Sequence, residues 1–170
     1  MAERTDAPTS AEPGVIAIER IFDAPPELVW KAWTEPDHVM RWWGPNTFTS
    51  PAVEIDFRVG GKFLFAMQSP EYQDGRTLWS TGEYREIVPF ERIVCTMAMA
   101  DEKGNIVSPA EYGMTEDSLE ESLLTVEFEA AGNGQTKMMM RHEGVPVGEM
   151  RDGANEGWNE SFDKLADSLK

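Results

Sequence analysis

One long amphipathic helix at the end of a chain of strand-like segments is the feature that most limits how this sequence can fold. From Glu149 to Lys170, Trp158, Phe162 and Leu165 recur three or four residues apart with charged residues between them, which predicts an amphipathic helix. A single helix cannot bury its apolar stripe alone, so the stripe must pack on one face of a sheet. This pattern predicts an α+β domain.

The strand-like segments are apolar, β-branched or alternating runs separated by turn residues. Gly60-Gly61 and Gly132-Asn133-Gly134 are expected to form tight turns, the first of them a two-residue hairpin turn. Short connections between successive strands imply antiparallel pairing. We therefore predict a seven-stranded antiparallel sheet that curls around the C-terminal helix. The predicted strands are Val15–Phe22, Ala52–Phe57, Lys62–Gln68, Thr77–Ile87, Arg92–Met99, Leu123–Ala130 and Thr136–His142.

Two short helices are predicted after the first strand, over Glu27–Thr34 and Pro36–Met40. Prolines suit the first turn of each helix, and Gly44-Pro45 ends the second. Helices this short are not stable alone, so they must be held by packing. Residues 1–13 show no periodic apolar pattern and are predicted to form a flexible tail, which leaves residues 14–170 as a single domain.

Composition excludes several classes of function. The formal net charge is −16 and the sequence pI is near 4.4, so most of the surface would repel a phosphate backbone, and nucleic acid is not an expected partner. No apolar run approaches the roughly 20 residues of a membrane-spanning helix, and the N-terminal stretch lacks the apolar segment of a signal peptide. The single cysteine, Cys95, rules out an internal disulfide and fits a reducing compartment. We therefore expect a cytoplasmic protein that does not insert into membranes.

Two adjacent tryptophans stand in the stretch RWWGPNTF, from Arg41 to Phe48. Neighbouring residues cannot both lie on one face of a helix, so Trp42 and Trp43 are expected to point in different directions. Such residues either pin short helices to the sheet or line the entrance of a cavity, where an indole ring can grip an amphipathic ligand. We expect one ring to pack on the helix side and the other to face a cavity entrance.

No catalytic or metal-binding motif occurs in the sequence. His38 and His142 are the only histidines, and the spacings HxH, HExxH and CxxC are absent, so no metal site is expected. A GxSxG nucleophile elbow and a glycine-rich phosphate loop are also absent, so we assign no catalytic residue and expect no cofactor. The polar residues that could still act inside a pocket are Asp56, Arg58, Glu83, Tyr84, Arg141 and His142.

Four stretches resemble a known family: Arg20–Pro45, Asp56–Met67, Gly82–Thr96 and Gly157–Leu169. Their order resembles the START or helix-grip (SRPBCC) superfamily, and more narrowly its branch named after the activator of heat-shock protein 90 ATPase homologue. The resemblance implies a curved sheet wrapped around the long C-terminal helix, with an apolar cavity between them. It leaves a homodimer and a chaperone open as protein partners.

We predict that this cavity binds a small hydrophobic or amphipathic molecule, such as a lipid, without a covalent step. Two alternatives remain: an interaction protein acting on a chaperone, which would have a filled interior, and an enzyme of cyclase or hydrolase type. The long polar segment Ala100–Ser118 is expected to cover the cavity mouth. The predicted cavity residues are Trp42, Trp43, Phe63, Phe65, Met97, Met99, His142, Trp158, Phe162 and Leu165.

Overall fold

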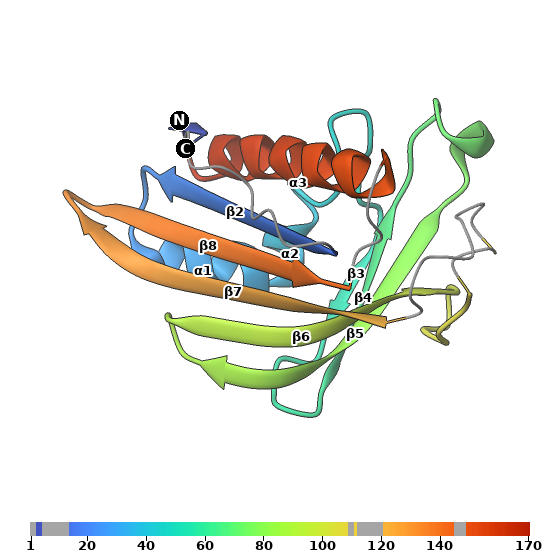
Figure 1. The fold of residues 1–170 in the computed structure, drawn as a ribbon, viewed down its shortest axis with the longest axis horizontal. Helices are drawn as coiled ribbons and strands as arrows, with labels where there is room; N and C mark the ends of the chain where they lie inside the picture. The colour runs from blue at the N-terminus through green and yellow to red at the C-terminus, as the bar shows by residue number, and fades with distance from the viewer. Residues whose placement is uncertain (1–2, 5–13, 109–110, 112–120, 145–148) are drawn as a thin grey trace.

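The computed structural model of the chain describes residues 3–4, 14–108, 111, 121–144 and 149–170. It shows one antiparallel sheet, two short helices and a long C-terminal helix (Figure 1), which confirms the predicted α+β class and the helix-grip fold. The strands are β1 (Glu3–Arg4), β2 (Val15–Phe22), β3 (Val53–Ile55), β4 (Lys62–Met67), β5 (Leu78–Val88), β6 (Arg92–Ala100), β7 (Glu121–Gly132) and β8 (Gln135–Glu143). The helices are α1 (Pro26–Thr34), α2 (Pro36–Val39) and α3 (Glu149–Ser168), with a short 3-10 turn at Gln73–Gly75.

The strands follow the order β1-β2-β8-β7-β6-β5-β4-β3 across the sheet. Every neighbouring pair is antiparallel, and the seven predicted strands are β2 to β8. The two-residue strand β1 falls inside the range predicted to be a flexible tail, and it pairs with β2 through Glu3 and Ile21. Because β2 pairs with β8, the first and last long strands of the chain lie side by side.

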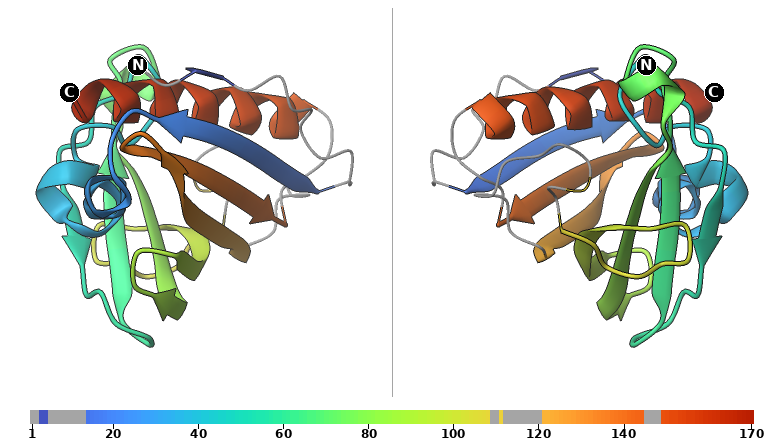
Figure 2. Two further views of the ribbon diagram at one scale, coloured as in Figure 1. Left: turned by 90° about the vertical axis from the view of Figure 1, so that its left-hand side faces the viewer. Right: turned by 90° about the vertical axis from the view of Figure 1, so that its right-hand side faces the viewer.

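A sharp bend of the sheet creates the space that the helices close. Figure 2 shows β2, β8 and β7 on one side and β3, β4 and β5 on the other, with α3 lying across the space between them. Strand β5 allows this bend at Gly82, where a Cβ atom would overlap the carbonyl oxygen of Thr96 and the ring of Phe63. A β-bulge between Tyr84 and Glu86 follows at once, and bulges add bend and twist to a strand.

The turn between β3 and β4 differs from the prediction, because Gly60-Gly61 does not form a two-residue hairpin. Residues 56–61 make the connection, and Gly60 adopts a positive φ of 86°. The Gly60 N–H donates to the Tyr84 carbonyl (2.8 Å), and the Tyr84 N–H donates to the Gly61 carbonyl (3.0 Å). The loop is therefore held by β5 as well as by its own strands, a long-range pairing that no local pattern encodes.

Helix α3 is tied to β2 by a buried cation as well as by its apolar face. Arg20 is fully buried, and its Nη2 donates to the Asn159 carbonyl and to Asp163 Oδ1, each at 2.8 Å. A charge taken out of water is tolerated only when it is paired and hydrogen-bonded, so this contact sets where α3 crosses β2. Among the helices of the described residues, none is long and apolar enough to cross a membrane.

The segment Ala100–Ser118 was predicted to cover the cavity mouth, but its described part lies away from the cavity. Ile106 bridges to Ala100 at the end of β6, and Gly104 comes beside the Leu64 side chain. Leu64 points to the face of β4 opposite to Phe63 and Phe65, since side chains alternate along a strand. Residues 109–110 and 112–120 of the predicted cover lie outside the described residues.

Two glycine-to-alanine substitutions should change stability in opposite directions. Gly82→Ala forces a methyl group into backbone and ring atoms, so we expect it to lower the free energy of unfolding by about 3 kcal/mol. Gly153→Ala lies in α3 with no atom within 4 Å of the new Cβ, so a gain of about 0.5 to 1 kcal/mol is expected. Urea denaturation measures both; equal effects would contradict the role given to Gly82.

Candidate ligand-binding site

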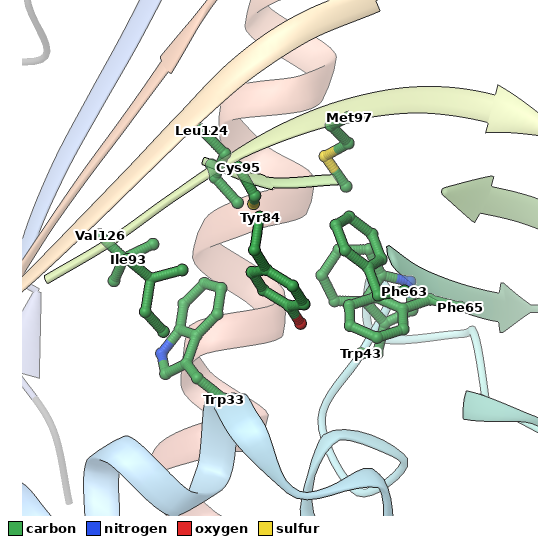
Figure 3. Close-up of a pocket in the computed structure, with 10 residues that line it drawn as sticks. All are labelled: Trp33, Trp43, Phe63, Phe65, Tyr84, Ile93, Cys95, Met97, Leu124 and Val126. Carbon is green, nitrogen blue, oxygen red and sulfur yellow. The ribbon is translucent and has the colours of Figure 1, made fainter. Parts of the chain in front are cut away.

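An apolar cavity lies between the bent sheet and the tryptophans that α1 and the segment after α2 contribute (Figure 3). The volume open to the centre of a water molecule is about 20 Å³, which is room for about one water. None of its lining residues carries a charged side chain. The lining consists of Trp33, Trp43, Phe63, Phe65, Tyr84, Ile93, Cys95, Met97, Leu124 and Val126.

The paired tryptophans point in different directions. Trp42 is fully buried, donates its indole N–H to the Ala32 carbonyl (2.8 Å) and meets the Trp33 ring edge-on, with 4.8 Å between ring centroids. Trp43 lines the cavity and packs edge-on against Phe65 (4.7 Å) and Trp158. The Trp43 indole nitrogen is buried and has no hydrogen-bond partner among the described residues. One ring thus holds the helices together and the other forms part of the cavity wall.

Helix α3 fastens the segment that follows the paired tryptophans. Lys164 Nζ donates to the carbonyl oxygens of Pro45 (3.1 Å) and Phe48 (3.0 Å), and the Asn46 N–H donates to Glu160 Oε1 (3.1 Å). Burial lowers the pKa of Lys164, and the nearby Glu160 carboxylate opposes that effect. Because these contacts fix the backbone after Trp43, they also fix the wall that this ring provides.

The titratable groups in the cavity lining stay neutral at physiological pH. Tyr84 is 3% exposed, and Figure 3 shows its ring between Trp33 and the group formed by Phe63, Phe65 and Trp43. Burial, with a smaller contribution from Cys95, raises the pKa of the Tyr84 phenol well above its usual range. Burial also raises the pKa of the Cys95 thiol to about 12. The cavity therefore offers hydrogen-bonding groups but no charge.

A chain of hydrogen bonds at His142 joins β8 to α3 and β7. Trp158 Nε1–H donates to His142 Nδ1 (3.2 Å), and His142 Nε2 lies 2.7 Å from Ser122 Oγ. An indole N–H can only donate, so the neutral imidazole carries its proton on Nε2 and donates it to Ser122. Ser122 in turn donates to the Met97 carbonyl (3.2 Å).

This serine and histidine pair is not arranged for nucleophilic catalysis. A serine nucleophile needs an unprotonated nitrogen facing its hydroxyl and a group that orients the base through its other nitrogen. Here the nitrogen that faces Ser122 carries the proton, and Trp158 occupies the other nitrogen of His142 as a donor. Burial lowers the pKa of His142 to about 4, which keeps this tautomer neutral.

The other polar residues singled out in the sequence do not converge on the cavity. All four of them form ion pairs with a residue two positions away in the sequence. These pairs are Asp56 with Arg58 (3.0 Å), Glu83 with Arg85 (3.4 Å) and Arg141 with Glu143 (3.6 Å), and in each the side chains are at least one-third exposed.

The ten predicted cavity residues fall into three groups. Trp43, Phe63, Phe65 and Met97 line the cavity described above. Trp42, Phe162 and Leu165 are fully buried in the surrounding core. Trp158, His142 and Met99 are not in the lining. Trp158 packs against Trp43 and donates to His142, and Met99 is half-buried near the end of β6.

Six lining residues were not among the predicted ones: Trp33, Tyr84, Ile93, Cys95, Leu124 and Val126. Strand alternation carried a signal for part of this set, because Ile93 and Cys95 share the face of Met97 in β6. Trp33 gave no such signal, since its distance from the sheet depends on how α1 packs.

Comparison with known proteins assigns the chain to a family. Residues 23–170 match the family described as Activator of Hsp90 ATPase homolog 1-like protein. None of the curated proteins compared with the sequence matches it.

Several solved structures share the fold at low sequence identity. A protein of Nitrosomonas europaea is 23% identical with a TM-score of 0.72, and the match covers 94% of this chain and 96% of that one. The AHSA1 protein of Silicibacter pomeroyi is 23% identical with a TM-score of 0.70, covering 91% and 96%. A Mycobacterium smegmatis protein is 19% identical with a TM-score of 0.74, covering 98% and 94%. At these identities the likeness shows the fold alone.

The largely enclosed imidazole of His142 should make stability depend on pH. The pKa of His142 falls from 6.5 to about 4 on folding, so the unfolded chain takes up the proton first as the pH drops. The free energy of unfolding should therefore decrease by about 2 kcal/mol more between about pH 7.5 and pH 5.0 in the native protein than in His142→Gln. Urea denaturation at both pH values measures this. Parallel pH profiles for the two proteins would contradict the assignment.

Proposed function

Because the chain belongs to the family of Activator of Hsp90 ATPase homolog 1-like proteins, whose fold commonly binds ligands, we propose that it binds a small hydrophobic molecule in the apolar cavity of its bent sheet. The site is the cavity that Trp33, Trp43 and the inner faces of β4 to β7 enclose. Binding needs no covalent step, because the lining offers no activated nucleophile.

The uncharged lining of the cavity is the observation that carries this proposal. Its walls combine aromatic rings with aliphatic side chains and a thioether, the usual surroundings of an apolar ligand. Few polar atoms interrupt these walls, and the side chains come from four strands and from the two tryptophan-bearing segments. Such a surface favours a ligand through burial of apolar area rather than through ion pairing.

A ligand must enlarge the cavity, since the described space holds about one water. Met97 is the most flexible lining side chain and is only half-buried, so rotation of its thioether offers one way to make room. The Trp43 ring is less free, because the segment after it is bound to Lys164. We propose that binding moves Met97 and leaves the tryptophans in place.

Tryptophan fluorescence tests the site with a matched pair of variants. A panel of neutral flavonoids, fatty acids and polyketide-like aromatics should include a compound that quenches the emission saturably. Trp43→Phe should raise its Kd about fivefold, because part of the aromatic contact is lost. Trp30→Phe makes the same chemical change among Phe57, Phe90 and Phe128, outside the cavity lining, and should change the Kd less than twofold.

Two results would refute the ligand-binding proposal. One is a folded protein that carries no copurified apolar molecule in native mass spectrometry and responds to no compound of the panel. The other is an equal effect of Trp30→Phe and Trp43→Phe, which would show that quenching reports on stability rather than on the cavity.

The small size of the cavity favours a second candidate function. An interaction protein that acts on a chaperone needs a surface and a filled interior, and a core with room for about one water meets that condition. With a net charge of −16, the chain would meet a basic patch on its partner. This candidate rests on the outer surface rather than on the cavity lining.

Salt dependence tests the second candidate. If the protein binds the middle portion of a heat-shock protein 90 chaperone through its acidic surface, the Kd should rise at least tenfold from about 0.05 M to about 0.5 M salt. Trp43→Phe should leave this affinity unchanged. Surface plasmon resonance measures both, and a lack of binding at low salt would exclude the candidate.

A further inference from the structure

We propose that the ligand of this cavity is uncharged and places a hydrogen-bond acceptor, such as a carbonyl oxygen, against the Tyr84 hydroxyl. This inference rests on the proposed function and narrows its class of ligand. It follows from two properties of the cavity: the absence of charge in its lining, and lining donors that make no hydrogen bond to another described residue.

The lining disfavours an ionised ligand. No lysine or arginine is among the residues that line the cavity. The fully buried guanidinium of Arg20 donates to Asp163 and Asn159 of α3 and does not belong to the lining. A carboxylate entering this space would lose its water and find no positive charge, which costs several kcal/mol. Neutral molecules do not carry that cost, so the cavity selects against the anionic head of a fatty acid.

The Tyr84 hydroxyl supplies the polar contact. Figure 3 shows it directed into the space between Trp33 and the aromatic group on β4. The structure shows no hydrogen bond between this hydroxyl and another described residue, and burial keeps it protonated. Tyr84 lines a cavity whose free space fits about one water. A ligand oxygen that replaces such a water regains a hydrogen bond in a site where an unpaired donor is costly.

The ligand is expected to carry a hydrogen-bond acceptor because the lining side chains of Tyr84 and Trp43 both offer donors. The lining residue Trp43 contributes a second donor, an indole N–H that is buried and has no partner among the described residues. An indole N–H only donates, and a neutral phenol can donate as well. A ketone, ester or ether oxygen therefore complements this wall better than a group that only donates.

Three small probes of similar shape test separately whether the cavity prefers a hydrogen-bond acceptor and whether it rejects a charge. Acetophenone carries a carbonyl, cumene replaces that carbonyl by a CH group with a methyl, and benzoate carries a full negative charge. The Kd of each is measured by ¹H–¹⁵N NMR titration of the native protein, Tyr84→Phe and Tyr72→Phe. Tyr72 is the matched control, because its hydroxyl accepts from Gln73 Nε2 and it does not line the cavity.

The inference predicts a specific pattern of affinities. Tyr84→Phe should lower the preference for acetophenone over cumene about tenfold, whereas Tyr72→Phe should change it less than twofold. Benzoate should bind at least tenfold more weakly than acetophenone to the native protein. An unchanged preference in Tyr84→Phe, or benzoate binding as tight as acetophenone, would overturn the inference and leave the proposed function standing. Failure of both neutral probes to bind the folded native protein would overturn the two together.

A measurement on the native protein keeps the inference testable if Tyr84→Phe does not fold. The ¹³C resonance of carbonyl-labelled acetophenone moves downfield when the oxygen accepts a hydrogen bond. We expect the bound resonance to lie downfield of its position in a hydrocarbon solvent. A bound resonance at the hydrocarbon position would show that no donor reaches the carbonyl, and would overturn the inference.

Discussion

The packing of α3 on Trp33 of α1 and on the paired tryptophans after α2 is the contact on which the rest of the structure depends. Phe162 is fully buried against Trp33 and Trp42, and Trp158 meets Trp33 and Trp43. Two helices as short as α1 and α2 have little stability of their own. The aromatic contacts supply it, and the same contacts close the bent sheet into a domain with an interior.

That interior is neutral, and its polar groups divide into two kinds. At the edge, Trp158, His142 and Ser122 satisfy one another in a directed chain that ends on a backbone carbonyl. Inside, the Trp43 indole N–H is buried without a partner among the described residues, and the Tyr84 hydroxyl points into the space beside Trp33. A satisfied network stabilises one arrangement of the elements, whereas an unsatisfied buried donor is a place where a ligand can add a bond. This contrast separates the structural part of the core from the candidate site.

Much of the fold was readable from local pattern, and the exceptions have physical causes. Alternation along β4 and β6 and helical spacing along α3 predicted which elements form, because these periods reflect burial of one face. The Gly60-Gly61 turn was misjudged because it is held by hydrogen bonds to Tyr84, far away in sequence. Likewise, no local rule shows that Gly82 has room only for a hydrogen atom beside Thr96.

The sequence by itself determined which side chains are apolar, which face of each strand they share, and that one long helix must be covered by the sheet. The tertiary structure decided which of these side chains meet. Trp42 and Trp43 differ by one position, yet one packs in the core and the other lines the cavity. The cavity volume and the unpaired state of the Trp43 N–H were also decided by the tertiary structure, because both depend on distances between segments far apart in the chain.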